Sequence, residues 1–131
     1  MAQSPTFPAD PIVDGDTAGG LITAFTFAIA DVASQDFDVV LDHKIEVVEI
    51  LVHKRGGAGG AANTVQVKNV ANAISEAMSL NVAQDAVVRN ATNTFANAVI
   101  DPAAGGKLRF SLVKAGGNAA CFVIVNFIRR N

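Results

Sequence analysis

Tryptophan and tyrosine are absent from this 131-residue sequence, and cysteine occurs once. Charged residues make up 17% of the chain, below the roughly 25% of typical soluble domains. The formal net charge is only -2, so neither nucleic acid nor an anionic membrane surface is an expected partner. A single cysteine cannot form an internal disulfide, so folding requires no oxidising compartment.

Long hydrophobic runs are also missing. The most apolar stretches, residues 17–30 and 115–128, are about 14 residues long, whereas a membrane-spanning helix needs roughly 20. The first residues show neither the basic segment nor the apolar segment of a secretory signal. We therefore expect no membrane association and synthesis in a cytoplasm.

Prolines and glycines are concentrated near the N-terminus, over residues 1–20. Pro5, Pro8 and Pro11 each fix a backbone angle and disfavour a helix just before them, which predicts an extended arm. Residues 21–131 then form the single domain that a chain of this length predicts.

Two interpretations of the arm remain open. It is either a frayed chain end or a docking segment that contacts a neighbouring subunit. In the second case, Phe7 and Ile12 are its candidate partner-binding residues.

Strand-like segments dominate the rest of the sequence. Turn-forming residues recur about every 8–12 residues from Leu21 onward, and no alternation of strands with helices is visible. The apolar alternation slips at Val47 and Val48, which indicates a bulge or a strand buried on both faces. Residues 70–80 fit a helix nearly as well as the strand we favour. The fold class expected is all-β, an antiparallel β-sandwich with jelly-roll winding. The expected strands cover residues 21–30, 37–41, 44–55, 64–68, 70–80, 87–88, 95–100, 107–114 and 119–130.

The last two strands, residues 107–114 and 119–130, are predicted to form a hairpin around Gly116 and Gly117. The second of them is apolar on both faces, although a strand in a two-layer sandwich has one outer face. An apolar outer face usually marks a subunit interface, so we expect the chain to form an oligomer. Burial of this strand under loops is the alternative. The candidate interface residues are Phe122, Ile124, Val125 and Ile128.

No catalytic constellation is visible. His43 and His53 lie ten residues apart, roughly 33 Å in an extended strand, so they cannot chelate one metal ion directly. Cys121 lies in an apolar strand and is expected to be a buried, inert thiol. The sequence therefore predicts a protein that is not an enzyme and that binds no metal or cofactor.

The C-terminal third carries turn-and-strand motifs at residues 105–111, 114–120 and 122–127, and the stretch of residues 73–89 adds to them. In these motifs the chain resembles the small, Ala/Asn-rich β-sandwich accessory proteins in the virions of tailed bacteriophages. The resemblance spans roughly residues 62–130 and assigns no functional residues.

The resemblance implies a capsid decoration (cement) protein on the virion surface. Such a protein would bind the major capsid protein as a homotrimer over a local three-fold axis and stabilise the shell. A trimeric head-fibre or tail-associated protein is the related alternative. A carbohydrate-binding β-sandwich module is a further alternative, which the absence of tryptophan and tyrosine disfavours.

Overall fold

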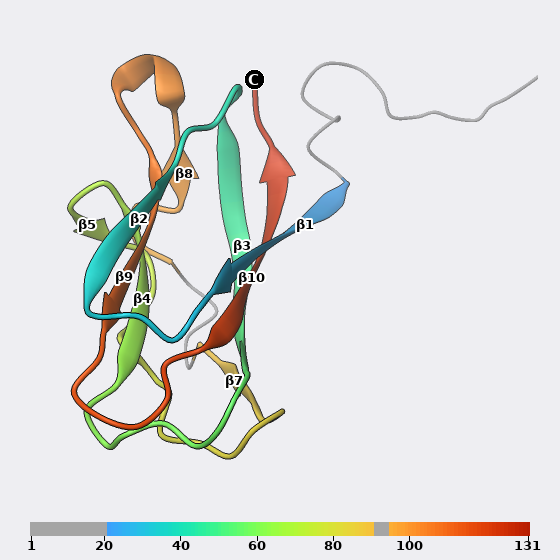
Figure 1. Ribbon diagram of the computed structural model, residues 1–131. Helices are drawn as coiled ribbons and strands as arrows, with labels where there is room; N and C mark the ends of the chain where they lie inside the picture. Colours follow the sequence, from blue (N-terminus) through green and yellow to red (C-terminus); the bar gives the residue numbers. More distant parts are fainter. Residues whose placement is uncertain (1–20, 91–94) are drawn as a thin grey trace, which may run out of the picture.

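A computed structural model describes residues 21–90 and 95–131, and it confirms the antiparallel β-sandwich (Figure 1). The predicted arm, with Phe7 and Ile12, lies outside the described residues. Two sheets pack face to face. We call them the β10 sheet and the β9 sheet, after the strand of each that comes last in the sequence. The β10 sheet has the order β1 (Ile22–Ile29), β10 (Cys121–Arg129), β3 (Ile45–Lys54) and β7 (Val87–Arg89), with β8 (Val99–Ile100) also paired to β3. The β9 sheet has the order β2 (Gln35–Val39), β9 (Leu108–Val113), β4 (Thr64–Asn69) and β5 (Asn72–Ala73), with β6 (Met78–Ser79) also paired to β4.

Helical structure in the described part of the chain is one 3₁₀ turn, η4 (Pro102–Ala104). Asp101 caps this turn, because its carboxylate accepts a hydrogen bond from the backbone N–H of Ala103. Within residues 21–90 and 95–131 there is no helix long and apolar enough to cross a membrane.

The predicted C-terminal hairpin is wrong. β9 pairs with β2 and β4, whereas β10 pairs with β1 and β3, so the link between β9 and β10 crosses from one sheet to the other. The link is held by distant parts of the chain. The side chain of buried Asn63 accepts a hydrogen bond from Ala115 N at 2.7 Å, and Asp31 accepts one from Ala119 N at 3.0 Å. These contacts, which local turn chemistry does not reveal, select the crossing over the hairpin.

The predicted bulge in the third strand is confirmed. The register between β3 and β10 shifts where Asn126 pairs with Glu49 and Phe127 pairs with Val47, so Val48 is the extra residue. The bulge lets the buried positions of β3 stay on the inner face along its whole length.

Two expected strands are shorter than predicted. Residues 70–80 contain only the two-residue strands β5 and β6, because Val70 has a positive φ of 55° and the chain turns there. The chain between them is fixed by Ser75, whose buried hydroxyl accepts a hydrogen bond from Val67 N at 2.9 Å. Residues 95–100 contribute only β8.

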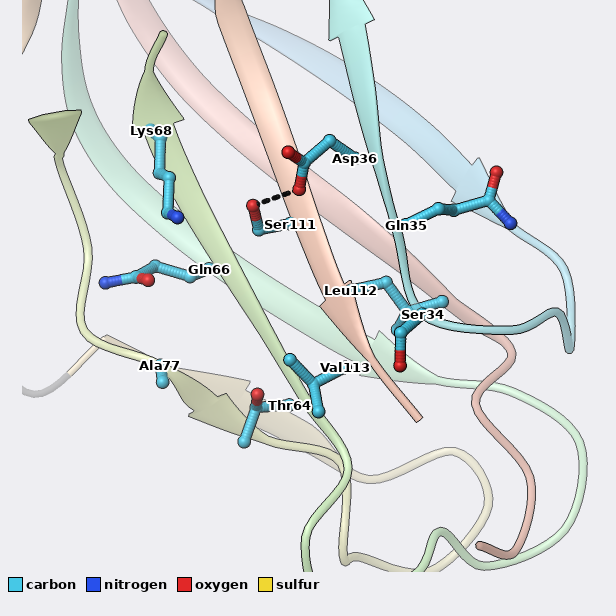
Figure 2. Close-up of a pocket in the computed structure, with 10 residues that line it drawn as sticks. All are labelled: Ser34, Gln35, Asp36, Thr64, Gln66, Lys68, Ala77, Ser111, Leu112 and Val113. Carbon is cyan, nitrogen blue, oxygen red and sulfur yellow. Dashed lines mark hydrogen bonds between the residues drawn. The ribbon is translucent and has the colours of Figure 1, made fainter. Parts of the chain in front are cut away.

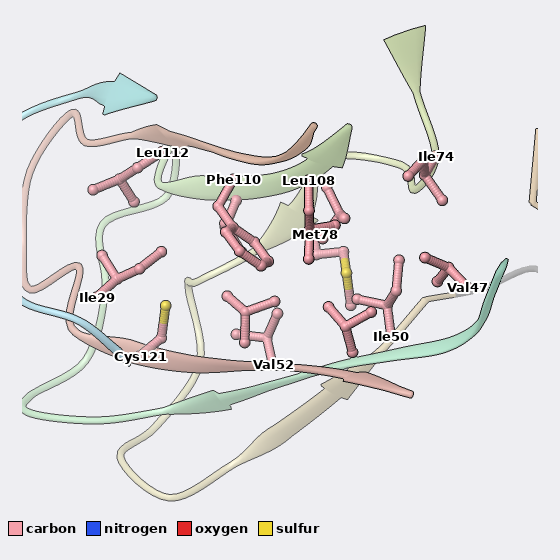
Figure 3. Packing of buried hydrophobic residues seen from close by; sticks show 14 of the residues in the cluster. Ile29, Val47, Ile50, Val52, Ile74, Met78, Leu108, Phe110, Leu112 and Cys121 are labelled. Carbon is pink, nitrogen blue, oxygen red and sulfur yellow. The ribbon is translucent and has the colours of Figure 1, made fainter. Parts of the chain in front are cut away.

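The core lies between the two sheets and is formed by the inward-facing side chains of both (Figure 3). Phe27 of β1 stacks on Phe110 of β9, with ring centroids 4.7 Å apart and ring planes 10° apart. Cys121 is buried here, as predicted. Because successive side chains of a strand point to opposite faces, the residues between these core positions form the outer faces of the sandwich.

Candidate functional site

The middle of the β10 sheet is apolar on its outer face. Val123 of β10 is fully buried in the core, so its neighbours Phe122 and Ile124 point outward. Asn126 and then Ile128 continue the same face. Cross-strand register places Ile124 between Thr26 of β1 and Leu51 of β3. We call this surface the outer patch, and it comprises Ile22, Ala24, Thr26, Ala28, Leu51, Phe122, Ile124 and Ile128.

Charged side chains border the outer patch on the β3 side. Glu49 of β3 pairs with Arg89 of β7 and accepts a hydrogen bond from Asn126 at 2.8 Å. At the end of the sheet, Glu46 pairs with Arg130 at 2.7 Å. On the opposite side, the outer positions of β1 carry no charge at all. An apolar centre with a polar rim is the anatomy of a protein–protein interface.

Phe122 is held in place by one cationic side chain, Arg55, and one aromatic side chain, His53. The guanidinium of Arg55 lies 5.4 Å above its ring centroid, and the ring of His53 approaches it edge-on at 6.1 Å. Asp85 accepts a hydrogen bond from Arg55 at 3.0 Å and lies 3.4 Å from His53 Nε2. These contacts fix one corner of the outer patch.

The four predicted interface residues divide between the two faces of β10. Phe122, Ile124 and Ile128 lie in the outer patch, half-buried by their neighbours. Val125 does not: it is 0% exposed and faces the core, so its assignment to an outer interface is wrong. With both faces of the strand apolar, the sequence alone did not decide which set points inward.

Other members of the outer patch come from β1 and β3, and sequence analysis missed them. A signal for β1 is present in the sequence, because small or polar residues at Ala24, Thr26 and Ala28 alternate with Phe25 and Phe27. The alternation identifies an outer face. It does not reveal that this face adjoins β10, which depends on the register of the sheet.

A second candidate surface is an open groove of about 490 Å³ on the outer face of the β9 sheet (Figure 2). Ser111 donates a hydrogen bond to Asp36, and the side chain of Gln66 donates one to Ser75 O at 2.9 Å. No histidine lines the groove, so Ser111 and Asp36 lack the base that a serine nucleophile needs. The groove lining consists of Ser34, Gln35, Asp36, Thr64, Gln66, Lys68, Ala77, Ser111, Leu112 and Val113.

The remaining reactive side chains in the described part of the chain do not form a site. Burial raises the pKa of the Cys121 thiol to about 11, so it is protonated at neutral pH and is a poor nucleophile. His43 precedes β3 and lies beside Asp42, whereas His53 lies near the other end of that strand. In the described ranges, no three His, Cys, Asp or Glu side chains are grouped as metal ligands.

Comparison of the chain with known protein families, with curated proteins and with solved structures finds no match. The resemblance to phage virion proteins therefore stays a hypothesis that rests on the turn-and-strand motifs.

Proposed function

We propose that this protein is a non-enzymatic assembly protein, namely a capsid decoration (cement) protein that binds a major capsid protein as a homotrimer. The observation that carries the proposal is the outer patch. Its central residues, Ile124, Leu51 and Phe122, are apolar, lie on the middle strands of a sheet and are bordered by ion pairs. An apolar surface rimmed by charge usually marks an interaction site. The choice of a capsid as the partner comes from the sequence resemblance.

The proposed mechanism is multivalent attachment. Each subunit contributes a modest contact to the shell, and joining three subunits through the outer patch raises the overall affinity by orders of magnitude without new chemistry. The arm over residues 1–20 adds a second contact. Its prolines restrict the unbound chain, which lowers the entropy lost when Phe7 and Ile12 bind.

We also propose jelly-roll winding for the sandwich. Its support is the order of the strands: β1 to β4 alternate between the two sheets, while β10 lies between β1 and β3 and β9 lies between β2 and β4. The chain thus winds as paired segments around the sandwich, as two interlocked Greek keys do.

The alternatives have weaker support. A head-fibre or tail-associated trimer would use the same apolar patch but another binding partner. Carbohydrate binding would use the groove on the β9 sheet, yet no aromatic ring among residues 21–90 and 95–131 lines it for stacking on a sugar. Two of its polar side chains, Asp36 and Gln66, are already hydrogen-bonded within the protein.

The test compares assembly and capsid binding of two matched variants. Ile124→Asp places a charge in the outer patch, whereas Val113→Asp places the same charge at an exposed apolar position on the other sheet. We expect the wild type and Val113→Asp to scatter light as trimers and to bind undecorated capsids. Ile124→Asp should lose both properties, because burying an unpaired charge costs several kcal/mol. A wild-type protein whose mass in solution is 13.5 kDa and that does not bind capsids contradicts the proposal.

A further inference from the structure

One edge of the β10 sheet lacks the protection that proteins usually give to edge strands. β1 pairs with β10 on one side and, among the described residues, with no strand on the other. It is eight residues long and contains no charged residue and no proline. A long, uncharged edge exposes a row of unpaired N–H and C=O groups that can pair with another strand.

The other edges in the described part of the sandwich are protected. β2 is five residues long and carries Asp36 and Asp38, and Asp38 binds Arg109 through two hydrogen bonds of 2.7 and 3.0 Å. β7 has three residues, and β5, β6 and β8 have two residues each. Short strands and charges are two devices that prevent edge-to-edge association. β1 therefore differs from every other described edge.

The sequence of β1 is symmetric about Thr26. Residues 24–28 are Ala-Phe-Thr-Phe-Ala in either direction. An antiparallel pairing of two copies centred on this residue places Thr26 opposite the partner's Thr26. The same pairing places Phe25 opposite the partner's Phe27. Cross-strand pairs of aromatic residues and of threonines are stabilising.

We propose that β1 pairs antiparallel with β1 of a second copy of this chain, across a two-fold axis at Thr26. The pairing joins the two β10 sheets into one continuous sheet. Facing residues of an antiparallel pair lie on the same side of the sheet, so the outer patch continues across the axis from Ala24 and Ala28.

The side chains on the inner face of β1 also favour pairing with a second copy of the chain. Phe25 and Phe27 pack against the core but stay half-buried, with ring centroids 6.5 Å apart. Phe27 also lies 5.5 Å from Phe37 of β2, so aromatic rings line the open side of the sandwich at this edge. The proposed pairing brings the partner's Phe25 next to Phe27 and removes apolar surface from water.

Residues 1–20 of the chain are a poorer occupant of this edge. Pro5, Pro8 and Pro11 have no N–H group, and a strand that adds to a sheet edge must donate hydrogen bonds at alternate residues. The edge of a second copy offers N–H groups throughout β1. We therefore commit to a second copy as the occupant.

The contact is independent of the proposed function. It is isologous, so it adds copies in pairs, and a trimer formed through the outer patch would become a hexamer. The proposed trimer uses the outer patch, whereas this contact uses the edge of β1.

A cysteine scan tests the register. In the full chain carrying Thr26→Cys, the new cysteine faces the same position of the second copy across the axis. The two Cβ atoms are then at the cross-strand separation of about 4.5–5.5 Å. Mild oxidation should therefore convert it to a covalent dimer, while native Cys121 is too buried to react. The matched control, Ala28→Cys, faces the partner's Ala24 and should crosslink only when mixed with Ala24→Cys. Equal crosslinking of Thr26→Cys and Ala28→Cys alone, or crosslinking of Thr26→Cys to a capsid subunit instead, overturns the proposal.

Charge complementation provides a second, non-covalent test. Thr26→Lys and Thr26→Glu each place like charges opposite one another and should weaken self-association several-fold, whereas an equimolar mixture should restore it. Gln35→Lys, at the β2 edge, adds the same charge and should have no effect. Sedimentation of the wild type as a monomer or trimer only, without dimers or hexamers, overturns the pairing. Because Thr26 also lies in the outer patch, the proposed function is judged from Ile124→Asp. Restoration by the Thr26→Lys and Thr26→Glu mixture reports on the β1 pairing alone, since damage to the patch would persist in the mixture.

Discussion

The ammonium group of Lys54 donates a hydrogen bond to the side-chain oxygen of Asn118, 3.4 Å away, and so ties the end of β3 to the link between β9 and β10. Lys54 is 0% exposed. It also donates to the backbone oxygens of Gly57 at 2.7 Å and Ala120 at 3.1 Å, and to that of Arg55. Burial lowers the pKa of Lys54. A single buried cation thus satisfies oxygens from two loops that are far apart in the sequence.

Replacing Lys54 with methionine should therefore destabilise the fold. Lys54→Met keeps most of the apolar stem but removes the donor to the part-buried backbone oxygens of Arg55 and Gly57. The oxygens of Ala120 and of the Asn118 side chain each keep only their bond from a backbone N–H. We expect a loss of about 2–4 kcal/mol in the free energy of unfolding, measured by urea denaturation at neutral pH. Lys68→Met is the control, since Lys68 lies on the groove surface, and it should change stability by no more than about 0.5 kcal/mol. Equal stabilities of the two variants would contradict the role assigned to Lys54.

Gly117 in the same link has a backbone conformation that other residues rarely adopt. Its φ is 63°, and a Cβ atom there would lie 2.5 Å from the backbone nitrogen of Gly60. Gly117→Ala should cost about 1–3 kcal/mol in thermal or urea unfolding, because both strain and overlap oppose it. Gly57→Ala is the matched control: no atom lies within 4 Å of its Cβ position, so the change should be neutral or slightly stabilising. If the two variants unfold alike, the inter-sheet link is not as tightly packed as described.

The sequence predicted strands better than it predicted their partners. Alternation in residues 21–30 and 119–130 was enough to place β1 and β10 within about two residues, because alternation is a local property. The path between β9 and β10 depends on Asn63 and Asp31, which lie 52 and 88 residues from their hydrogen-bond donors in the link. A local pattern carries no information on such contacts, and a hairpin was predicted for that reason.

The candidate site could be predicted only in part, for a related reason. Both faces of β10 are apolar, so the sequence does not distinguish Ile124 in the outer patch from Val125 in the core. Alternate residues of the strand point to opposite faces, but which set points inward becomes known only once the neighbouring strands are known. Thr26 and Leu51, which flank Ile124, enter the site through that pairing alone.

Removing the arm should separate binding from folding. Deletion of residues 2–12 should leave thermal unfolding of the sandwich nearly unchanged while weakening binding to undecorated capsids. Phe7→Ala alone should cost about 1–3 kcal/mol of binding free energy, the scale of a buried aromatic anchor. The measurement is a binding titration of intact and truncated protein. Equal affinities would show that the arm is only a frayed chain end.

The buried thiol of Cys121 should make stability depend on alkaline pH. Burial raises its pKa to about 11 from an ordinary value of 9.0, while the positive charge of Lys54 opposes part of this shift. Between these values the folded protein keeps the proton that the unfolded chain releases. The stabilisation is therefore complete below about pH 9 and is lost as the pH rises toward 11, with a loss of about 1 kcal/mol between pH 8 and pH 10. The lowered pKa of Lys54 acts in the opposite direction, but that lysine is present in both the wild type and a cysteine variant. Urea unfolding across this range should show a smaller decline in Cys121→Ala than in the wild type, whatever constant offset the missing sulfur causes. Parallel curves for the two proteins would mean that the thiol ionises as readily in the folded state as in the unfolded chain.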